Sequence, residues 1–278
     1  MSLGARLFAN LGAEEGPRWR ASASDPRVEQ AARLWAALFS RESQRIDSSS
    51  PPAWPASLGP RRPGPAFPWL EDGQAMVPWL CTEEARDRAA AERLALHGVS
   101  PKLAMRVHDK AFSQRVALGE RLCPSALADC IAALAPEDFR DLPTAQARLR
   151  ETCSHWPPWA RRRFTLKPRL GSSGRGRLEG RDGAVDPATL EGALERLRNS
   201  GGAILEPWLD RTRDLSAELY VGREGPPLLL GTLEQRVTPS GLYRGHCGWV
   251  DSRGRVFSGL GADEEVREAA VILANAAQ

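Results

Sequence analysis

Short apolar runs and helical periods alternate along the first hundred residues. Residues 5–13 are predicted to form a short strand that runs into a glycine-containing turn, and residues 75–80 a second strand. Helices are predicted from Asp25 onward and over residues 83–97. Alternation of this kind is typical of a small α/β unit with a parallel sheet.

The pattern changes twice within the first half of the chain. Residues 47–68 are rich in Ser, Pro and Gly, hold no hydrophobic period, and are predicted to form a loop. Near residue 100 the dipeptide Ser100-Pro101 interrupts the chain, and residues 104–107 are predicted to form a short strand. We therefore expect two domains, residues 1–104 and residues 105–278.

The second half of the chain is predicted to mix helices with strands. The helices are expected at 110–118, 125–134, 144–152, 189–199 and 263–277. The strands are expected at 163–168, 203–206, 215–222, 227–235 and 242–250. The fold class predicted for the whole chain is therefore α/β with α+β character.

Composition narrows the class of protein. The 278 residues are 42% hydrophobic and 26% charged, as in an ordinary globular protein. No apolar run approaches the roughly 20 residues that span a bilayer, and the first residues lack the pattern of a signal peptide. We expect a cytoplasmic protein without a membrane partner, and a homo-oligomer is compatible with the sequence.

The spacing of the cysteines and histidines argues against disulfide and zinc sites, and the net charge indicates no polyanionic partner. The five cysteines include no CxxC pair, and the four histidines have no metal-ligand spacing, so neither a disulfide framework nor a zinc site is indicated. A net charge of +3 does not by itself imply a polyanionic partner. Lysine occurs only at positions 102, 110 and 167 among many arginines. Each lysine is therefore a candidate for a place where a compact ammonium is needed.

The strongest chemical signal is a lysine at a strand end with a glycine-rich loop behind it. Lys167-Pro168 ends the strand, and the loop carries Gly171, Ser172, Ser173, Gly174 and Gly176. Glycines let backbone N–H groups turn toward an anion, and serine hydroxyls add donors. The pattern predicts a phosphate site, and the alternative is a basic surface hairpin.

Two weaker signals accompany this loop. Glu206-Pro207-Trp208-Leu209 ends the strand that follows, where exposed backbone suits an adenine edge and Trp208 and Leu209 offer apolar surface. Asp109-Lys110 lies at the start of a helix. The alternatives are a strand-end turn with a buried tryptophan and an ordinary helix start with a solvated lysine.

Together the three motifs resemble those of the ATP-grasp superfamily. Its members carry a lysine that opens the first helix, a strand ending in Lys-Pro or Lys-Ala before a glycine loop, and a strand ending in Glu-x-Tyr/Trp-Ile/Leu. The resemblance implies an ATP-grasp fold with an N-terminal Rossmann-like pre-ATP-grasp domain. It further implies a small lid subdomain at about 110–205 and the start of a large subdomain at about 206–278.

The resemblance also implies roles for single residues. Lys110 and Lys167 would contact the phosphates of ATP, the loop residues 171–176 would close over them, and Glu206, Trp208 and Leu209 would line the adenine hinge. Asp214 would contact the ribose. Glu218 is the candidate magnesium ligand, and Arg236 is the candidate catalytic residue. Family chemistry activates a carboxylate as an acyl phosphate, which an amine or thiol then attacks, with Mg²⁺ on the phosphates.

The sequence departs from the family pattern in one respect, and two alternative functions remain open. Family members continue into strands with acidic metal ligands, whereas this sequence stops at Gln278 within a predicted helix, so we expect a fragment of a longer ligase. A non-catalytic nucleotide-binding module of the same fold is the first alternative. The second is a nucleic-acid-binding protein that uses the basic stretch 161–177, but only Phe164 interleaves with its arginines as an aromatic platform.

Overall fold

The computed structural model describes residues 6–8, 10–15, 30, 74–221, 227–239, 241–250, 256–259 and 263–277. Contacts divide the chain into two compact units, Met1–His108 and Asp109–Gln278, which are treated separately below. The predicted loop 47–68 lies outside the described residues, as does the predicted helix from Asp25 apart from residue 30.

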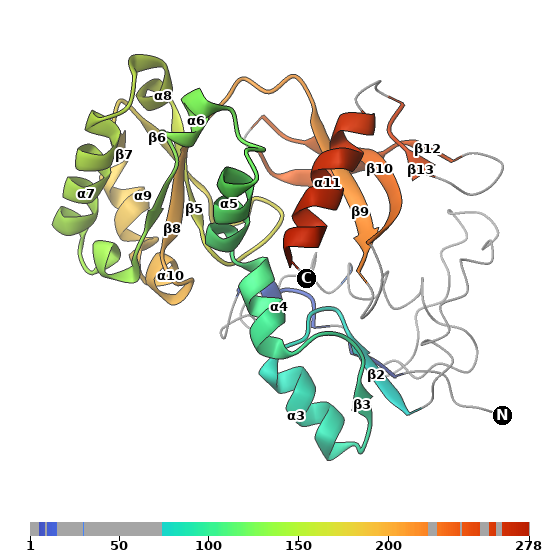
Figure 1. The fold of residues 1–278 in the computed structure, drawn as a ribbon. Helices are drawn as coiled ribbons and strands as arrows, with labels where there is room; N and C mark the ends of the chain where they lie inside the picture. The colour runs from blue at the N-terminus through green and yellow to red at the C-terminus, as the bar shows by residue number, and fades with distance from the viewer. Residues whose placement is uncertain are drawn as a thin grey trace. The chain divides into compact units, whose positions relative to one another are not determined.

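The first unit contains a three-stranded parallel sheet. Its strands are β1 (Arg6–Phe8), β2 (Ala75–Pro78) and β3 (Ala95–Leu96), in the order β1-β2-β3, and a short 3₁₀ turn, η1, covers Ala13–Glu15. Phe8 and Met76 from the sheet are buried with Ala85 and Ala89 of helix α3 (Glu83–Ala91). The parallel α/β unit predicted from the sequence is confirmed (Figure 1).

Two predicted elements of this unit are wrong. Helix α3 ends at Ala91 instead of continuing to residue 97, because the chain turns at Arg93 with φ 56° and returns to the sheet as β3. The strand predicted at 104–107 is part of helix α4 (Pro101–His108). Ser100-Pro101 begins this helix, since the Ser100 hydroxyl accepts a hydrogen bond from the Leu103 amide at 3.3 Å and proline suits the first helical position.

The second unit begins with an antiparallel sheet, which we call the Lys167 sheet. Its strand order is β4-β8-β5-β6-β7. The strands are β4 (Ala132–Leu134), β5 (Phe164–Pro168), β6 (Leu178–Arg181), β7 (Ala184–Val185) and β8 (Ala203–Pro207). The helices are α5 (Lys110–Gly119), α6 (Ser125–Ala128), η4 (Pro136–Phe139), α7 (Leu142–Ser154), α8 (Pro158–Arg162), α9 (Pro187–Glu191) and α10 (Leu194–Asn199).

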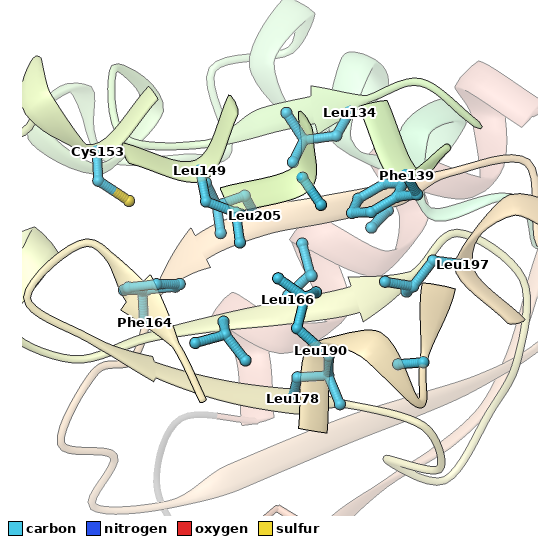
Figure 2. Close-up of a cluster of buried hydrophobic side chains, with 14 of the residues drawn as sticks. Leu134, Phe139, Leu149, Cys153, Phe164, Leu166, Leu178, Leu190, Leu197 and Leu205 are labelled. Carbon is cyan, nitrogen blue, oxygen red and sulfur yellow. The ribbon is translucent and has the colours of Figure 1, made fainter. Parts of the chain in front are cut away.

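One face of the Lys167 sheet forms the apolar core. Phe164 and Leu166 of β5 and Leu205 of β8 are fully buried against side chains of α7, α9 and α10, as Figure 2 shows. Leu149 and Leu197 from these helices have almost no exposed surface. This packing fixes β5 and β8 side by side and so determines where their alternate residues point.

Three features of this part differ from the sequence prediction. The helix expected at 125–134 is split into α6 and β4, because Ala132–Leu134 pair with β8. The helix expected at 189–199 is two helices, with a break at Gly192. The hairpin of β6 and β7 was not predicted, and its turn places Asp182 and Gly183 at positive φ of 49° and 80°.

A second sheet completes the unit, and we call it the Arg236 sheet. Its strands are β9 (Asp214–Tyr220), β10 (Leu228–Val237), β11 (Tyr243–Cys247), β12 (Trp249–Val250) and β13 (Val256–Phe257). They follow the order β11-β10-β13-β12, with β9 also paired to β10, and helix α11 (Asp263–Ala277) lies against β9 and β10 (Figure 1). Within the described residues no helix combines the length and apolar character needed to cross a bilayer.

Candidate nucleotide-binding site

Lys167 and Glu206 meet on the face of the Lys167 sheet opposite the apolar core. Side chains alternate between the faces of a strand, so the burial of Leu166 and Leu205 on one face directs their neighbours Lys167 and Glu206 to the other. The Lys167 ammonium donates to a Glu206 carboxylate oxygen, and these side chains keep 32% and 28% of their exposure. The pair is therefore accessible to a ligand.

Lys110 reaches the same region from helix α5. Asp109 caps the start of this helix, because its carboxylate accepts a hydrogen bond from the Ala111 amide at 2.9 Å. The same carboxylate accepts a second hydrogen bond from Arg169 Nε at 3.0 Å. The Lys110 ammonium donates to the carbonyl of Gly171 at 2.6 Å and, more weakly, to that of Arg169 at 3.4 Å. Lys110 is thus tied to the loop that follows β5.

The electrostatics of Lys110 are those of a crowded cationic site. Burial and, second to it, the nearby charge of Lys167 lower the pKa of Lys110 to about 8, although Asp109 and Glu206 act in the opposite direction. Burial alone raises the pKa of Asp109, but hydrogen bonds from Arg169 and the Ala111 amide outweigh it, so the pKa of Asp109 is lowered. The site therefore holds a partly desolvated ammonium that an anion would stabilise in its charged form.

The glycine loop has a conformation that needs its glycines. Gly171, Gly174 and Gly176 have φ of 121°, 72° and 71°, in the region that side chains disfavour. A Cβ on Gly174 would lie 2.4 Å from the backbone oxygen of Gly241, so no side chain fits there. The Tyr243 amide also donates to the Ser173 carbonyl at 3.4 Å. The loop is therefore held against the turn before β11.

These elements enclose a cavity of about 180 Å³, which we call the Lys167 cavity. It is lined by Lys110, Lys167, Pro168, Gly171, Ser172, Ser173, Gly174, Arg175, Arg177, Trp208, Arg211 and Gly241. The two lysines, most of the loop and Trp208 thus come together as one lining. Gly176, Glu206, Leu209 and Asp214 do not line this cavity, although Glu206 holds Lys167 beside it.

Sequence reasoning did not assign three arginines of this lining to the nucleotide site: Arg175, Arg177 and Arg211. Arg175 and Arg177 were considered only as part of the basic stretch 161–177. The Trp208 ring gathers two of them, with the Arg177 guanidinium carbon 3.9 Å and that of Arg211 4.5 Å from the ring centroid. Arg177 also donates to the Thr165 hydroxyl at 3.3 Å, and burial lowers its pKa. Trp208 is half-buried and lines the cavity.

The signal for Arg177 was present in the strand pattern. Thr165 lies opposite Glu179 on β6, and Arg177 is two residues earlier, on the same face as Lys167. The predicted order of elements contained β5, but β6 was not predicted, and so the partner strand that carries Arg177 toward the site was missing.

The remaining predicted residues lie around the hinge and on the Arg236 sheet. Leu209 is 44% exposed, and it lines a second cavity of about 390 Å³ together with Asp214 and Arg236. Asp214 pairs with Arg211, whereas the Arg236 Nε donates to the Cys247 sulfur at 3.4 Å. Glu218 is exposed on β9 and does not line either cavity.

A metal site does not form from the described side chains alone. Among the residues that the structure describes, no three His, Cys, Asp or Glu side chains come together in a group that could hold a metal ion. Two of the acidic residues predicted for the site, Glu206 and Asp214, are engaged by Lys167 and Arg211. The donor set fits a polyanion and does not provide a magnesium cage.

The architecture of the chain is that of the ATP-grasp fold, as its sequence motifs predicted. No protein-family model matches the chain, and no curated protein matches it at a significant level. Among solved structures, D-alanyl-alanine synthetase A from Vibrio cholerae is 11% identical with a TM-score of 0.51, and the match covers 100% of this chain and 81% of that one.

Two further solved structures extend the comparison. N5-carboxyaminoimidazole synthetase from Staphylococcus aureus, complexed with ADP, is 10% identical with a TM-score of 0.51 over 99% of this chain and 64% of that one. A biotin carboxylase from Campylobacter jejuni is 15% identical with a TM-score of 0.48, over 73% of this chain. The chain spans 43% of the length of that biotin carboxylase, less than half.

Proposed function

We propose that this chain binds ATP, with the phosphates in the Lys167 cavity. The observation that carries the proposal is the convergence of Lys110, Lys167 and the glycine loop on one cavity from three separate elements. A triphosphate needs fixed positive charges and many backbone donors, and this lining supplies both. Trp208 and the exposed Leu209 supply apolar surface for the base at the end of β8.

The cavity is preorganised for an anion. The Lys110 ammonium is already desolvated and is directed by its bonds to Gly171 and Arg169, so little reorganisation is needed on binding. A side chain at Gly174 would collide with Gly241, so this loop conformation needs glycine at that position. We assign Gly171, Ser172, Ser173, Gly174 and Gly176 to the phosphate loop.

We further propose that ATP serves a carboxylate–amine or carboxylate–thiol ligation through an acyl phosphate. Glu206 would position Lys167, Asp214 would contact the ribose, and Arg236 would position the reacting groups. The solved structure of N5-carboxyaminoimidazole synthetase with ADP supports nucleotide binding by this fold. A non-catalytic nucleotide-binding module remains the alternative, and it predicts binding without turnover.

Calorimetry of ATP binding tests the site. We expect Lys110→Ala and Lys167→Ala each to weaken ATP binding by about 1–3 kcal/mol, the contribution of one hydrogen bond to a charged group. Lys102→Ala is the matched control, because Lys102 is an exposed lysine of α4 outside the cavity. Unchanged ATP affinity in both cavity variants would disprove the assignment.

Two assays separate the functional alternatives. Release of ADP and phosphate with a panel of carboxylates and amines or thiols supports ligase activity, and ATP binding without release supports the binding module. Binding of single-stranded nucleic acid that falls steeply with salt and ignores ATP would instead favour the basic stretch 161–177 as the functional surface.

A further inference from the structure

Two cavities of the second unit share the side chain of Arg211. The Lys167 cavity has a volume of about 180 Å³, and the cavity beside Asp214 and Arg236, which we call the Asp214 cavity, has about 390 Å³. Trp208 and Arg211 line both cavities. Pockets for whole small ligands usually measure about 300–1,000 Å³, so a nucleotide needs more room than the Lys167 cavity provides. A nucleotide with its phosphates in the Lys167 cavity and its ribose at Asp214 therefore meets the Arg211 side chain.

Arg211 contacts the two groups that the proposed function assigns to the nucleoside. Its guanidinium carbon lies 4.5 Å from the centroid of the Trp208 ring, the surface proposed for the base. The same guanidinium forms an ion pair with Asp214, the contact proposed for the ribose. A planar guanidinium stacks on an aromatic ring much as a base does, and it donates to a carboxylate much as ribose hydroxyls do. Arg211 therefore occupies the place of a nucleoside.

Arg211 is also the most easily displaced of three guanidinium groups around the Trp208 ring. Arg163 lies farther from the ring centroid, at 5.3 Å, and donates to both carboxylate oxygens of Glu179 at 3.1 and 3.3 Å. Arg177 lies 3.9 Å from the centroid and directly precedes β6. Arg211 belongs to the connection between β8 and β9, and its side chain is 33% exposed. Ion pairs and cation–π contacts at such exposed positions contribute little, so moving this side chain costs little.

A displaced Arg211 guanidinium has a new partner only if the ligand carries phosphates. Arg211 already lines the Lys167 cavity, where a phosphate chain would offer it charge-assisted hydrogen bonds in exchange for its ion pair with Asp214. A nucleoside without phosphates offers no such bonds, so it must displace the side chain without compensation. The position of Arg211 therefore disfavours nucleosides and favours nucleotides.

We propose that Arg211 is a specificity-determining residue, which occupies the nucleoside place between Trp208 and Asp214 in the nucleotide-free protein and yields it to ligands whose phosphates then bind the guanidinium. The proposal rests on the proposed ATP site and assigns to Arg211 the selection of nucleoside phosphates against nucleosides. Removal of this one side chain has opposite effects on the two halves of the ligand: it strengthens binding of the nucleoside and weakens binding of the phosphate chain.

The experiment titrates the two halves of the ligand separately on the full chain. Adenosine supplies the base and ribose, and sodium tripolyphosphate supplies the phosphate chain; both are titrated calorimetrically, with ATP as the reference. We expect Arg211→Ala to bind adenosine about threefold to fivefold more tightly than wild type, because no cation–π contact has to be broken. We expect it to bind tripolyphosphate about tenfold more weakly, through loss of one charge-assisted contact. Damage to the fold would weaken both ligands, so the opposite shifts are specific to the proposal.

Two further variants separate charge from shape and control for a lost surface arginine. Arg211→Lys keeps the positive charge without the planar guanidinium, so it should keep most of the tripolyphosphate affinity and bind adenosine with an affinity between those of wild type and Arg211→Ala. Arg148→Ala is the matched control. Arg148 also pairs with an acid three residues later, Glu151, and it lies on α7 with 41% of its side chain exposed. Both affinities should be unchanged in this control.

The outcomes distinguish this inference from the ATP site itself. If the wild-type protein does not bind ATP, the proposed ATP site is wrong and the role of Arg211 falls with it. If ATP binds but Arg211→Ala does not bind adenosine more tightly, or does not lose tripolyphosphate affinity, the ATP site stands and the role of Arg211 is wrong. Absence of measurable adenosine binding to both proteins has the same meaning. Far-ultraviolet circular dichroism confirms that each variant is folded.

Discussion

The two faces of the Lys167 sheet use the same strands for opposite purposes. On β5, Phe164 and Leu166 are fully buried in the apolar core, whereas Lys167 on the other face keeps 32% of its side chain exposed and lines a cationic cavity. On β8, Leu205 joins the core while Glu206 meets Lys167. Because neighbours in one strand point to opposite faces, stability and ligand binding are separated by a single step along the chain.

The core face and the cavity face contribute differently to folding and to ligand binding. The core face removes apolar surface from water and stabilises the fold. The cavity face gathers like charges, and burial together with the charge of Lys167 lowers the pKa of Lys110, which means that the folded state disfavours that charge. We therefore expect substitutions on the core face to change unfolding and substitutions on the cavity face to change binding.

The largest effect is expected on the core face, from Phe164→Ala. Phe164 has no exposed surface and meets Trp156 edge to face, with ring centroids 6.3 Å apart. Removal of a buried phenylalanine side chain leaves a cavity, so the free energy of unfolding should fall by about 3–5 kcal/mol. Urea unfolding followed by circular dichroism measures the change.

A control and a binding measurement complete this test. Phe164→Leu keeps most of the buried volume and is expected to lose less stability than Phe164→Ala. Folded Phe164→Ala protein should bind ATP with wild-type affinity. A fall in ATP affinity as large as that of Lys167→Ala would show that the two faces are not separate.

Secondary structure was predictable from the sequence where the local pattern of residues determines it. The helix at Lys110, the strand at Phe164–Pro168 and the final helix were expected from periodicity and helix-start signals, and the structure has them. Ala132–Leu134 were expected to be helical, but they form β4 because β8 offers a pairing edge. That pairing is a tertiary contact, which alanine-rich local sequence does not reveal.

The residues of the candidate site were likewise predictable only where they lie together in the sequence or match a family motif. Lys167 and its loop stand together in the sequence, and Lys110 was found through its family-like position. Arg211 and Arg177 are brought to the cavity by stacking on Trp208, which depends on how β5, β6 and β8 pair in space. Alternation along β6 could have placed Arg177 on the cavity face, whereas nothing local in the sequence distinguishes Arg211 from the other arginines.

A smaller effect is expected on the cavity face, from the pH dependence of ATP binding. The pKa of Lys110 is about 8 because of burial and of the charge of Lys167, so the free protein loses this charge as pH rises above that value. Binding then requires uptake of a proton, and affinity should fall by about tenfold between pH 7 and pH 9. Calorimetry at constant ionic strength measures the profile.

Variants of Lys110 assign the pH profile to that side chain. Lys110→Arg keeps its charge throughout this range and should flatten the profile. Lys110→Met should lose binding and be at least as stable as wild type at pH 7, because the lowered folded-state pKa destabilises the protein below pH about 8, and this destabilisation is relieved as pH rises toward the ordinary value of 10.5. A profile that stays steep in Lys110→Arg points to another titrating group.

The smallest effect is expected at Thr165, where the two faces meet. Thr165 lies on the cavity face of β5 yet is fully buried, and its hydroxyl donates to the Leu178 carbonyl and accepts from Arg177. Thr165→Val removes both bonds at nearly constant shape and should lower the free energy of unfolding by about 0.5–1.5 kcal/mol. It should also weaken ATP binding through the loosened Arg177, whereas Thr165→Ser, which keeps the hydroxyl, should retain most of that affinity. If Thr165→Val changes stability and leaves ATP affinity unchanged, Trp208 positions Arg177 without help from the threonine. The two faces would then contribute to folding and to binding more independently than the hydrogen bonds of Thr165 indicate.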